Sequence, residues 1–132
     1  MSGPLTESPL VRAEIPMRFK PGETLFKEGD EPEGIYILEA GQADLLFSAR
    51  NGHVKPLRVV QSGQILGLSA VVGNKPHDCT AIARTGCRVG FIDRQSLRRL
   101  LDENPSTWFD VLRLLSNDVN AAYDDMRSLV NR

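Results

Sequence analysis

The sequence has 132 residues, of which 41% are hydrophobic, and a formal net charge of −1. This length suits one domain with a core and is too short for two. Sixteen basic and seventeen acidic residues leave no basic excess, which argues against a domain that binds nucleic acid by neutralising phosphates.

Cysteine usage and hydropathy exclude further classes of protein. Cys79 and Cys87 are the two cysteines, and their spacing matches neither a zinc site nor a disulfide scaffold. The longest apolar run, residues 65–73, is too short to span a membrane, and the N-terminus lacks the pattern of a signal peptide. The sequence therefore predicts a cytoplasmic protein with no membrane partner.

The first part of the chain predicts a flexible leader followed by short strands. Pro4, Pro9 and Pro16 interrupt any regular pattern in residues 1–16. From Met17 onward, strand-like segments alternate with turn residues at intervals of roughly 8 to 12 residues, which is typical of an antiparallel sandwich or barrel. We expect strands within residues 19–20, 24–26, 35–38 and 43–48.

The strongest hairpin signal is Asn51-Gly52, between the apolar segments 45–47 and 57–60. Pro56 favours an edge position for the second strand, because proline has no backbone N–H to donate to a neighbouring strand.

The stretch 63–81 has the form of a binding cassette. Gly67 lies where a strand must bend into a short helix, and glycine reaches the positive φ that such a bend often needs. Residues 68–72 suit a helical turn, which the turn-forming residues 73–76 close. The first amides of such a helix can bind an anion. The alternative, a tight corner without a ligand, is favoured by these residues alone.

Two strands and a helix follow the cassette. Segments 79–84 and 88–92 predict strands, with Thr85-Gly86 as the turn between them. Asp93 is a good N-cap for a helix over residues 94–103, which places its leucines on one face.

The last segment predicts one long helix that forms a homodimer. Pro105 is favoured at a helix start, and no proline or glycine follows it. Apolar residues recur at alternating spacings of three and four, which favours a parallel coiled-coil pair over packing of the whole helix on its own sheet. The predicted seam consists of Leu112, Leu115, Val119, Ala122, Met126 and Leu129.

Three blocks of sequence resemble the cyclic-nucleotide-binding domain superfamily. They are residues 19–30 (FKPGETLFKEGD), 35–41 (IYILEAG) and 63–68 (GQILGL). Within the superfamily they are similar to the sensor domains of Crp/Fnr-type bacterial transcription regulators, which are related to the catabolite activator and the fumarate/nitrate reductase regulators. The resemblance covers about residues 17–131.

The resemblance implies a mainly β fold, a β-jelly-roll followed by a short helix and a long dimerisation helix. The implied organisation is a flexible leader (1–16), a β-roll (17–104) and a dimerisation helix (105–132). A small effector, whose identity is unknown, would bind under the long helix and change how the two long helices pack. DNA binding would require a helix-turn-helix domain, which we expect to lie outside this chain.

The cassette departs from the pattern of members that bind cyclic nucleotides. Such members place a glutamate after the glycine, on the ribose, and an arginine ten residues later, on the cyclic phosphate; this sequence has Leu68 and Asp78 there. Loss of two charged hydrogen bonds weakens binding by roughly a hundredfold to ten-thousandfold. A cyclic nucleotide is therefore disfavoured and no other cofactor is predicted. The residues expected to line this degenerate pocket are Gly67, Leu68, Ser69, Ala70, Asp78, Cys79 and Thr80.

Nearby basic residues offer substitutes for the missing arginine. Lys75, Arg84 and Arg88 are the cations close in sequence, and a one-residue shift within 74–77 would still leave Arg84 as the nearest arginine.

Two other classes of function remain open. One is a ligand-independent dimerisation or scaffold domain, whose pocket is filled by Leu68, Val71 and Val72. The other is a haem or redox-linked sensor using His53 or His77. The sequence predicts neither a catalytic residue nor a metal site, because paired carboxylates, a catalytic triad and metal-ligand spacing are all missing, so we expect no enzyme.

Overall fold

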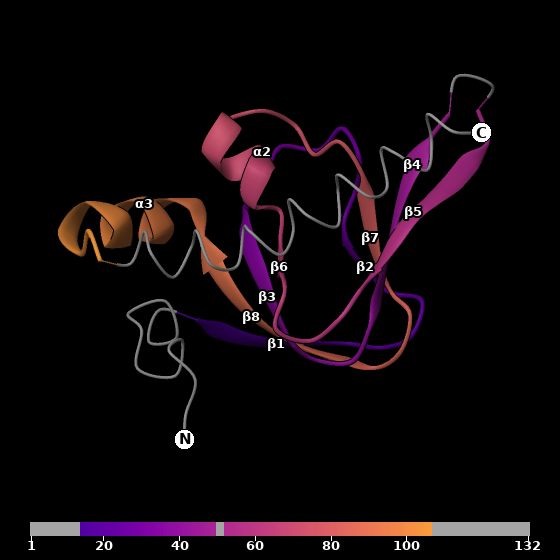
Figure 1. The fold of residues 1–132 in the computed structure, drawn as a ribbon, viewed down its shortest axis with the longest axis horizontal. Helices are drawn as coiled ribbons and strands as arrows, with labels where there is room; N and C mark the ends of the chain where they lie inside the picture. Colours follow the sequence, from indigo (N-terminus) through magenta and orange to yellow (C-terminus); the bar gives the residue numbers. More distant parts are fainter. Residues whose placement is uncertain (1–13, 50–51, 107–132) are drawn as a thin grey trace.

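The computed structural model describes residues 14–49 and 52–106. The elements in chain order are β1 (Ile15–Phe19), β2 (Thr24–Phe26), β3 (Gly34–Ala40), β4 (Ala43–Ser48), β5 (Val54–Val60), β6 (Ile65–Leu66), α2 (Leu68–Gly73), β7 (Thr80–Ala83), β8 (Cys87–Asp93) and α3 (Arg94–Glu103). Figure 1 shows α2 and α3 together at one end of the strands.

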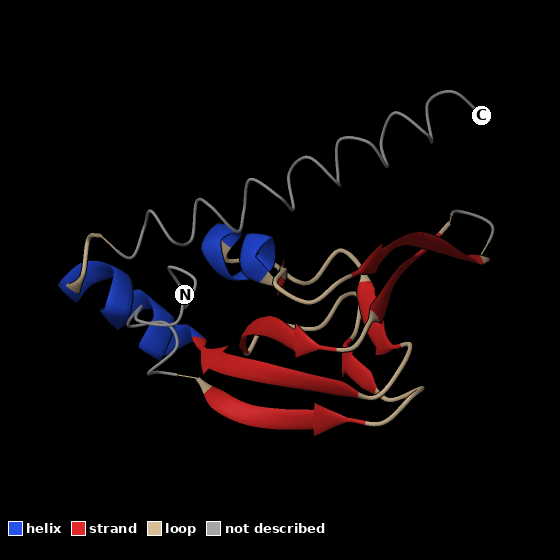
Figure 2. Ribbon diagram, turned by 60° about the horizontal axis from the view of Figure 1, so that its bottom comes forward, coloured by secondary structure: helices blue, strands red, loops and turns tan. Residues whose placement is uncertain are grey.

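The strands form two antiparallel four-stranded sheets with the orders β1-β8-β3-β6 and β2-β7-β4-β5. Except for the β4–β5 hairpin, each strand is followed by a strand of the other sheet. This arrangement, seen from a second direction in Figure 2, confirms the predicted mainly β jelly-roll.

Strand β3 lies in the middle of the molecule and is buried on both faces. Tyr36 and Leu38 belong to the core between the two sheets. Ile35 and Ile37 belong to a second apolar cluster, which includes Leu97 and other residues of α2 and α3. Because side chains alternate along a strand, a continuous apolar run lets β3 pack in both directions.

Local signals in the sequence set the ends of several elements as predicted. The Asp93 carboxylate caps α3 by accepting hydrogen bonds from the Ser96 amide (2.9 Å) and the Ser96 hydroxyl (2.7 Å). Strand β5 carries Pro56 and lies at the edge of its sheet, as expected.

The N-terminal boundary differs from the prediction. Residues 15 and 16, assigned to the leader, begin β1, in which Pro16 pairs with Gly90. Proline is tolerated there because β1 is an edge strand. Most of the predicted leader (1–13) and the predicted dimerisation helix from residue 107 onward lie outside the described residues, so the seam stays a prediction.

The Glu14 carboxyl group lies over Gly90, where any side chain would collide with it. Burial, and then the negative charge of Glu39, raise the pKa of Glu14 from 4.5 to about 7. Since this pKa is raised in the folded state, the contribution of Glu14 to folding stability is fully present below about pH 4.5 and is lost as pH rises to about 7.

Glu14→Gln is therefore expected to stabilise the protein by about 1–2 kcal/mol at pH 8 and to have little effect at pH 4, after allowance for partial exposure. Urea unfolding at both pH values measures this difference. Glu31→Gln, at an exposed position, is the matched control. Equal effects of the two substitutions at pH 8 would contradict the assignment.

Candidate functional site

The predicted corner between β6 and α2 is formed by Gly67, whose backbone is left-handed (φ 83°, ψ 2°). A Cβ atom at this position would lie 3.2 Å from the Gly34 carbonyl oxygen and 3.3 Å from Cε1 of His77. Glycine is therefore required both by its φ and by the close approach of its neighbours. Asn74, also left-handed (φ 51°), ends α2.

His77 lies directly against this corner. Its side chain is 5% exposed, and its ring stacks on Phe26 with a centroid separation of 4.0 Å and an interplanar angle of 16°. Two backbone hydrogen bonds fix the residue: the His77 amide donates to Asp30 O (3.0 Å) and the Gly29 amide donates to His77 O (2.8 Å).

The environment of the His77 imidazole favours its neutral form. Burial lowers its pKa below the ordinary value, although the charges of Asp78 and Asp30 act in the opposite direction. Sequence reasoning did not include His77 in the cassette lining. The available signal was its place one residue before Asp78, in the turn that returns from α2.

Four of the residues predicted to line the pocket lie in two different environments. Leu68 (3% exposed) and Ala70 (3% exposed) are buried, and Leu68 packs in the apolar cluster that contains Ile35 and Leu97. Ser69 and Asp78 are exposed. That these residues surround one ligand stays a prediction.

Cys79 directly precedes the return strand β7, and Thr80 begins it. Cys79 packs in the core between the two sheets. The Thr80 hydroxyl accepts a hydrogen bond from the Glu28 amide (2.9 Å), which joins the start of β7 to the turn after β2.

The Cys79 thiol stays protonated at physiological pH. Burial raises its pKa to about 12; Asp78 and Glu28 also raise it, and the positive charge of Arg58 lowers it. Because the thiolate is the nucleophilic form, the neighbouring His77 and Cys79 do not make a reactive pair.

The three basic residues that could have replaced the missing arginine each contact another part of the protein. Arg84 pairs with Asp44 (Nη1 to Oδ1, 3.5 Å), and Arg88 lies 4.0 Å from Glu39. The Lys75 side chain packs against Gly73, at the C-terminal end of α2.

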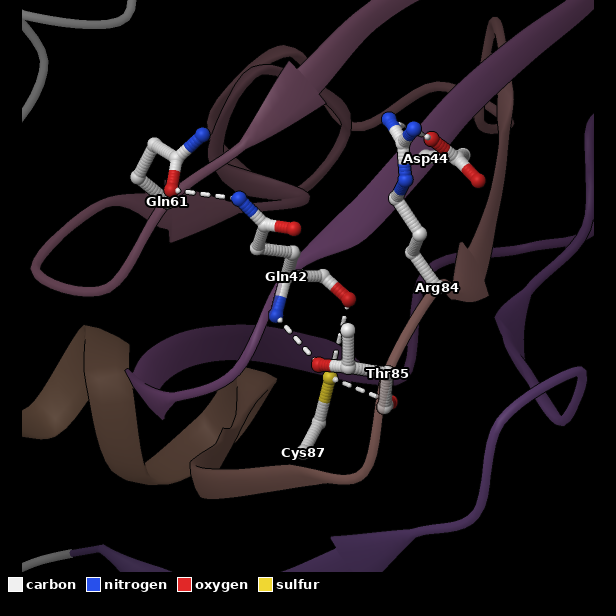
Figure 3. A network of polar contacts seen from close by, with 6 residues as sticks. All are labelled: Gln42, Asp44, Gln61, Arg84, Thr85 and Cys87. Carbon is white, nitrogen blue, oxygen red and sulfur yellow. Dashed lines mark hydrogen bonds and ion pairs between the residues drawn. The ribbon is translucent and has the colours of Figure 1, made fainter.

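Figure 3 shows Arg84 beside a polar network that joins three turns. The Gln42 amide donates to the Thr85 hydroxyl (3.0 Å) and the Gln42 side chain donates to Gln61 (3.1 Å). The Cys87 thiol donates to the carbonyl oxygen of Gln42 (3.2 Å). This network is structural, because its polar groups satisfy one another.

A groove of about 470 Å³ lies between α2 and α3, and its lining includes none of the seven residues predicted to line the ligand pocket. At one end of it, Arg94 donates hydrogen bonds to Pro32 O (3.2 Å) and to the side-chain oxygen of Asn74 (3.1 Å). The residues that line the groove are Val71, Val72, Arg94, Gln95, Leu97, Arg98, Leu101 and Asp102.

Residues 14–49 and 52–106 contain neither a cluster of metal-ligating side chains nor a helix that could span a membrane. In these ranges, no three His, Cys, Asp or Glu side chains come together as metal ligands would. Neither helix of the described chain has the length and apolar character of a membrane span.

Comparison with known proteins identifies relatives of this chain. The family model described as "Cyclic nucleotide-binding domain" matches residues 16–104. A cAMP-dependent protein kinase regulatory subunit of Aspergillus niger is 31% identical over 85 residues, which are 64% of this chain and 20% of that protein. The chain thus spans about one fifth of the length of this relative.

Solved structures share the fold at low sequence identity. The regulator CLP of Xanthomonas campestris, described as c-di-GMP responsive, has a TM-score of 0.81 at 15% identity; the match covers 91% of this chain and 59% of that one. The catabolite activator protein of Thermus thermophilus has a TM-score of 0.77 at 16% identity, covering 92% of this chain and 57% of that one. At these identities the likeness establishes the fold alone.

Proposed function

This chain belongs to the cyclic nucleotide-binding domain family, and we propose that it is the effector-binding sensor domain of a Crp/Fnr-type transcription regulator whose cassette does not bind cyclic nucleotides tightly. The observation that carries the proposal is the position of Leu68. The residue after the cassette glycine is 3% exposed and packs in an apolar cluster, where it offers no hydrogen bond to a ribose.

The second departure from members that bind cyclic nucleotides is the missing arginine for the cyclic phosphate. The ring beside Gly67 belongs to His77, whose pKa is lowered by burial, and Asp78 adds a carboxylate next to it in the chain. A neutral imidazole provides one donor and no charge, whereas an arginine provides a charged fork of donors. These features support weak binding of cAMP and cGMP.

The packing of α2 supports a way to transmit binding. Leu68 and Val71 share one apolar cluster with Leu97 and Leu101 of α3, so a ligand that displaced α2 would disturb α3. The effector must contact the two states differently for this to work. In the proposal, a homodimer through residues 105–132 carries the change to a DNA-binding domain in the cytoplasm, and sedimentation analysis tests the dimer.

Calorimetric titration with cAMP and cGMP tests the proposed cassette. A hundredfold loss from a micromolar Kd leaves an expected Kd of about 0.1 mM or weaker. Thermal shift extends the test to weak effectors, because ligand at ten times its Kd stabilises by about 1.4 kcal/mol. Micromolar binding of either nucleotide would overturn the proposal. Cyclic di-GMP belongs in the same screen, because the similar regulator CLP is described as responsive to it.

A ligand-independent dimerisation domain is the second candidate. It is favoured by the burial of Leu68 and Val71 in the core and by the His77 ring that covers Gly67. A persistent dimer that no ligand in the screen stabilises would select this candidate.

A further inference from the structure

The floor of the groove between α2 and α3 is an apolar surface that is partly exposed. Val72 is 58% exposed, whereas its neighbour in the lining, Val71, is buried. Val71, Leu97 and Leu101 line the groove and also belong to the apolar cluster packed on β3. The floor is thus an extension of the core, and an occupant that covered it would remove apolar surface from water, which is favourable.

The α3 side of the groove carries a small excess of positive charge. Arg94 and Arg98 line it, against one acidic residue, Asp102. The Arg94 guanidinium group is held by Pro32 O and Asn74, whereas Arg98 is exposed. The groove therefore suits an occupant that combines a large apolar face with a carboxylate placed toward Arg98.

The chain supplies a segment of this kind directly after α3. Residues 107–112 have the sequence TWFDVL, in which apolar residues flank one acid, Asp110. Trp108 and Phe109 are the largest side chains of the segment, and an aromatic side chain buries about 150–250 Å² when it packs. The segment thus matches both the apolar floor and the charge of the groove.

The segment lies close enough in the chain to reach the groove. Helix α3 ends at Glu103, and residues 105 and 106 form a turn, which allows the chain to reverse its direction. The lining from Arg94 to Leu101 follows α3 for about 10 Å at 1.5 Å per residue. A segment of six residues spans about 9 Å as a helix and about 20 Å when extended, so residues 107–112 can cover this length in either conformation.

We propose that residues 107–112 dock in the groove between α2 and α3 of their own chain. The two aromatic residues of the segment cover Val72, and Asp110 lies toward Arg98. This inference is independent of the proposed function, because the occupant is part of the chain and no effector is required.

The short connection favours the segment of the same chain over that of a second copy. Residues 104–106 alone join α3 to the segment, and a short link gives an effective concentration on the order of millimolar. A second copy would need a similar concentration to compete. The predicted dimer seam begins at Leu112, so docking of the residues before it leaves the seam available to a second copy.

The fluorescence of Trp108 measures the proposed docking, because this is the single tryptophan of the chain. The emission maximum and quenching by acrylamide are recorded on the full chain, over a range of protein concentrations, without substitution and with Val72→Asp. Val54→Asp is the matched control, since Val54 is 63% exposed, lies on β5 and is not part of the groove lining. Melting temperatures show that each variant is folded, and Val72→Ala replaces Val72→Asp should the latter not fold.

We expect Trp108 of the unmodified chain to be shielded from acrylamide at all concentrations. Val72→Asp should shift the docking equilibrium by about tenfold or more toward the free segment, because a covered carboxylate loses its hydration. Emission then moves to longer wavelength and quenching increases. Val72→Ala should have a smaller effect in the same direction, and Val54→Asp should have none.

Equal quenching of Trp108 in the unmodified chain, Val72→Asp and Val54→Asp would overturn docking in this groove. Shielding that is lost on dilution would show that a second copy supplies the segment, and would overturn docking within one chain.

A charge exchange tests the position of Asp110. Arg98→Glu should increase the quenching of Trp108, because it brings two carboxylates together, and the double variant Arg98→Glu with Asp110→Arg should restore the shielding. A double variant that is quenched as strongly as Arg98→Glu alone would overturn the placement of Asp110 beside Arg98.

Discussion

Leu68→Glu is expected to destabilise the fold by about 3–5 kcal/mol instead of creating a cyclic-nucleotide site. The side chain at position 68 is 3% exposed and is enclosed by residues of β3, β6, β8, α2 and α3. A carboxylate there would lose its hydration and find no charged partner in the cluster. Its neighbours in the cluster are Ile35, Ile37, Ile65, Val71, Ile92, Leu97 and Leu101.

Urea unfolding at neutral and acidic pH, with and without cAMP, measures this effect. Burial raises the pKa of an introduced carboxyl group, so the penalty should grow as pH rises above about 4.3 and shrink below it. Ser69→Glu is the matched control, because position 69 is exposed; a change within about 0.5 kcal/mol is expected. A Leu68→Glu protein that is as stable as the control and binds cAMP tightly would show that position 68 faces the effector.

Gly41→Ala is expected to cost about 3 kcal/mol or more. Gly41 has a φ of 94°, and an added Cβ atom would collide with the carbonyl oxygen of Gly86. It would also lie 3.0 Å from the Thr85 hydroxyl and 3.1 Å from the Cα atom of Cys87. The backbone on the opposite side cannot yield without breaking the hydrogen bond between Gln42 and Thr85 shown in Figure 3.

Gly22→Ala separates the two causes of this loss. Gly22 has a similar φ of 89°, but no atom lies within 4 Å of an added Cβ. This substitution should therefore destabilise the fold only through the strain of a positive φ, by about 1–2 kcal/mol. Chemical denaturation of both variants measures the difference, and equal losses would show that the collision at Gly41 is relieved without cost.

Much of the fold follows from local signals in the sequence. The Asp93 cap and the residues closing α2 involve residues close together in the chain, and the structure agrees with both. The antiparallel pairing of β4 with β5 agrees with the hairpin predicted between them, although Asn51 itself lies outside the described residues. The burial of β3 on both of its faces follows from its unbroken run of apolar residues. The order of strands within each sheet was not predictable in this way, because it depends on pairing between distant segments.

The candidate site was less predictable because contacts between distant residues build it. His77 is placed by its stack on Phe26 and by hydrogen bonds to the 29–30 turn, none of which is visible in the spacing around Gly67. The β4–β5 pairing shifts between Leu45 and Leu46, and simple alternation along β5 does not reveal such a bulge.

The side chain of Arg94 links the movements of α2 and α3. Its two hydrogen bonds attach the first residue of α3 to the carbonyl of Pro32, in the loop before β3, and to Asn74, which ends α2. A shift of α2 must either pull α3 in the same direction or detach Asn74 from the guanidinium group. The hydrogen bonds of Arg94 therefore couple the position of α2 to that of α3, so that a displacement of one helix changes the free energy of the other's position.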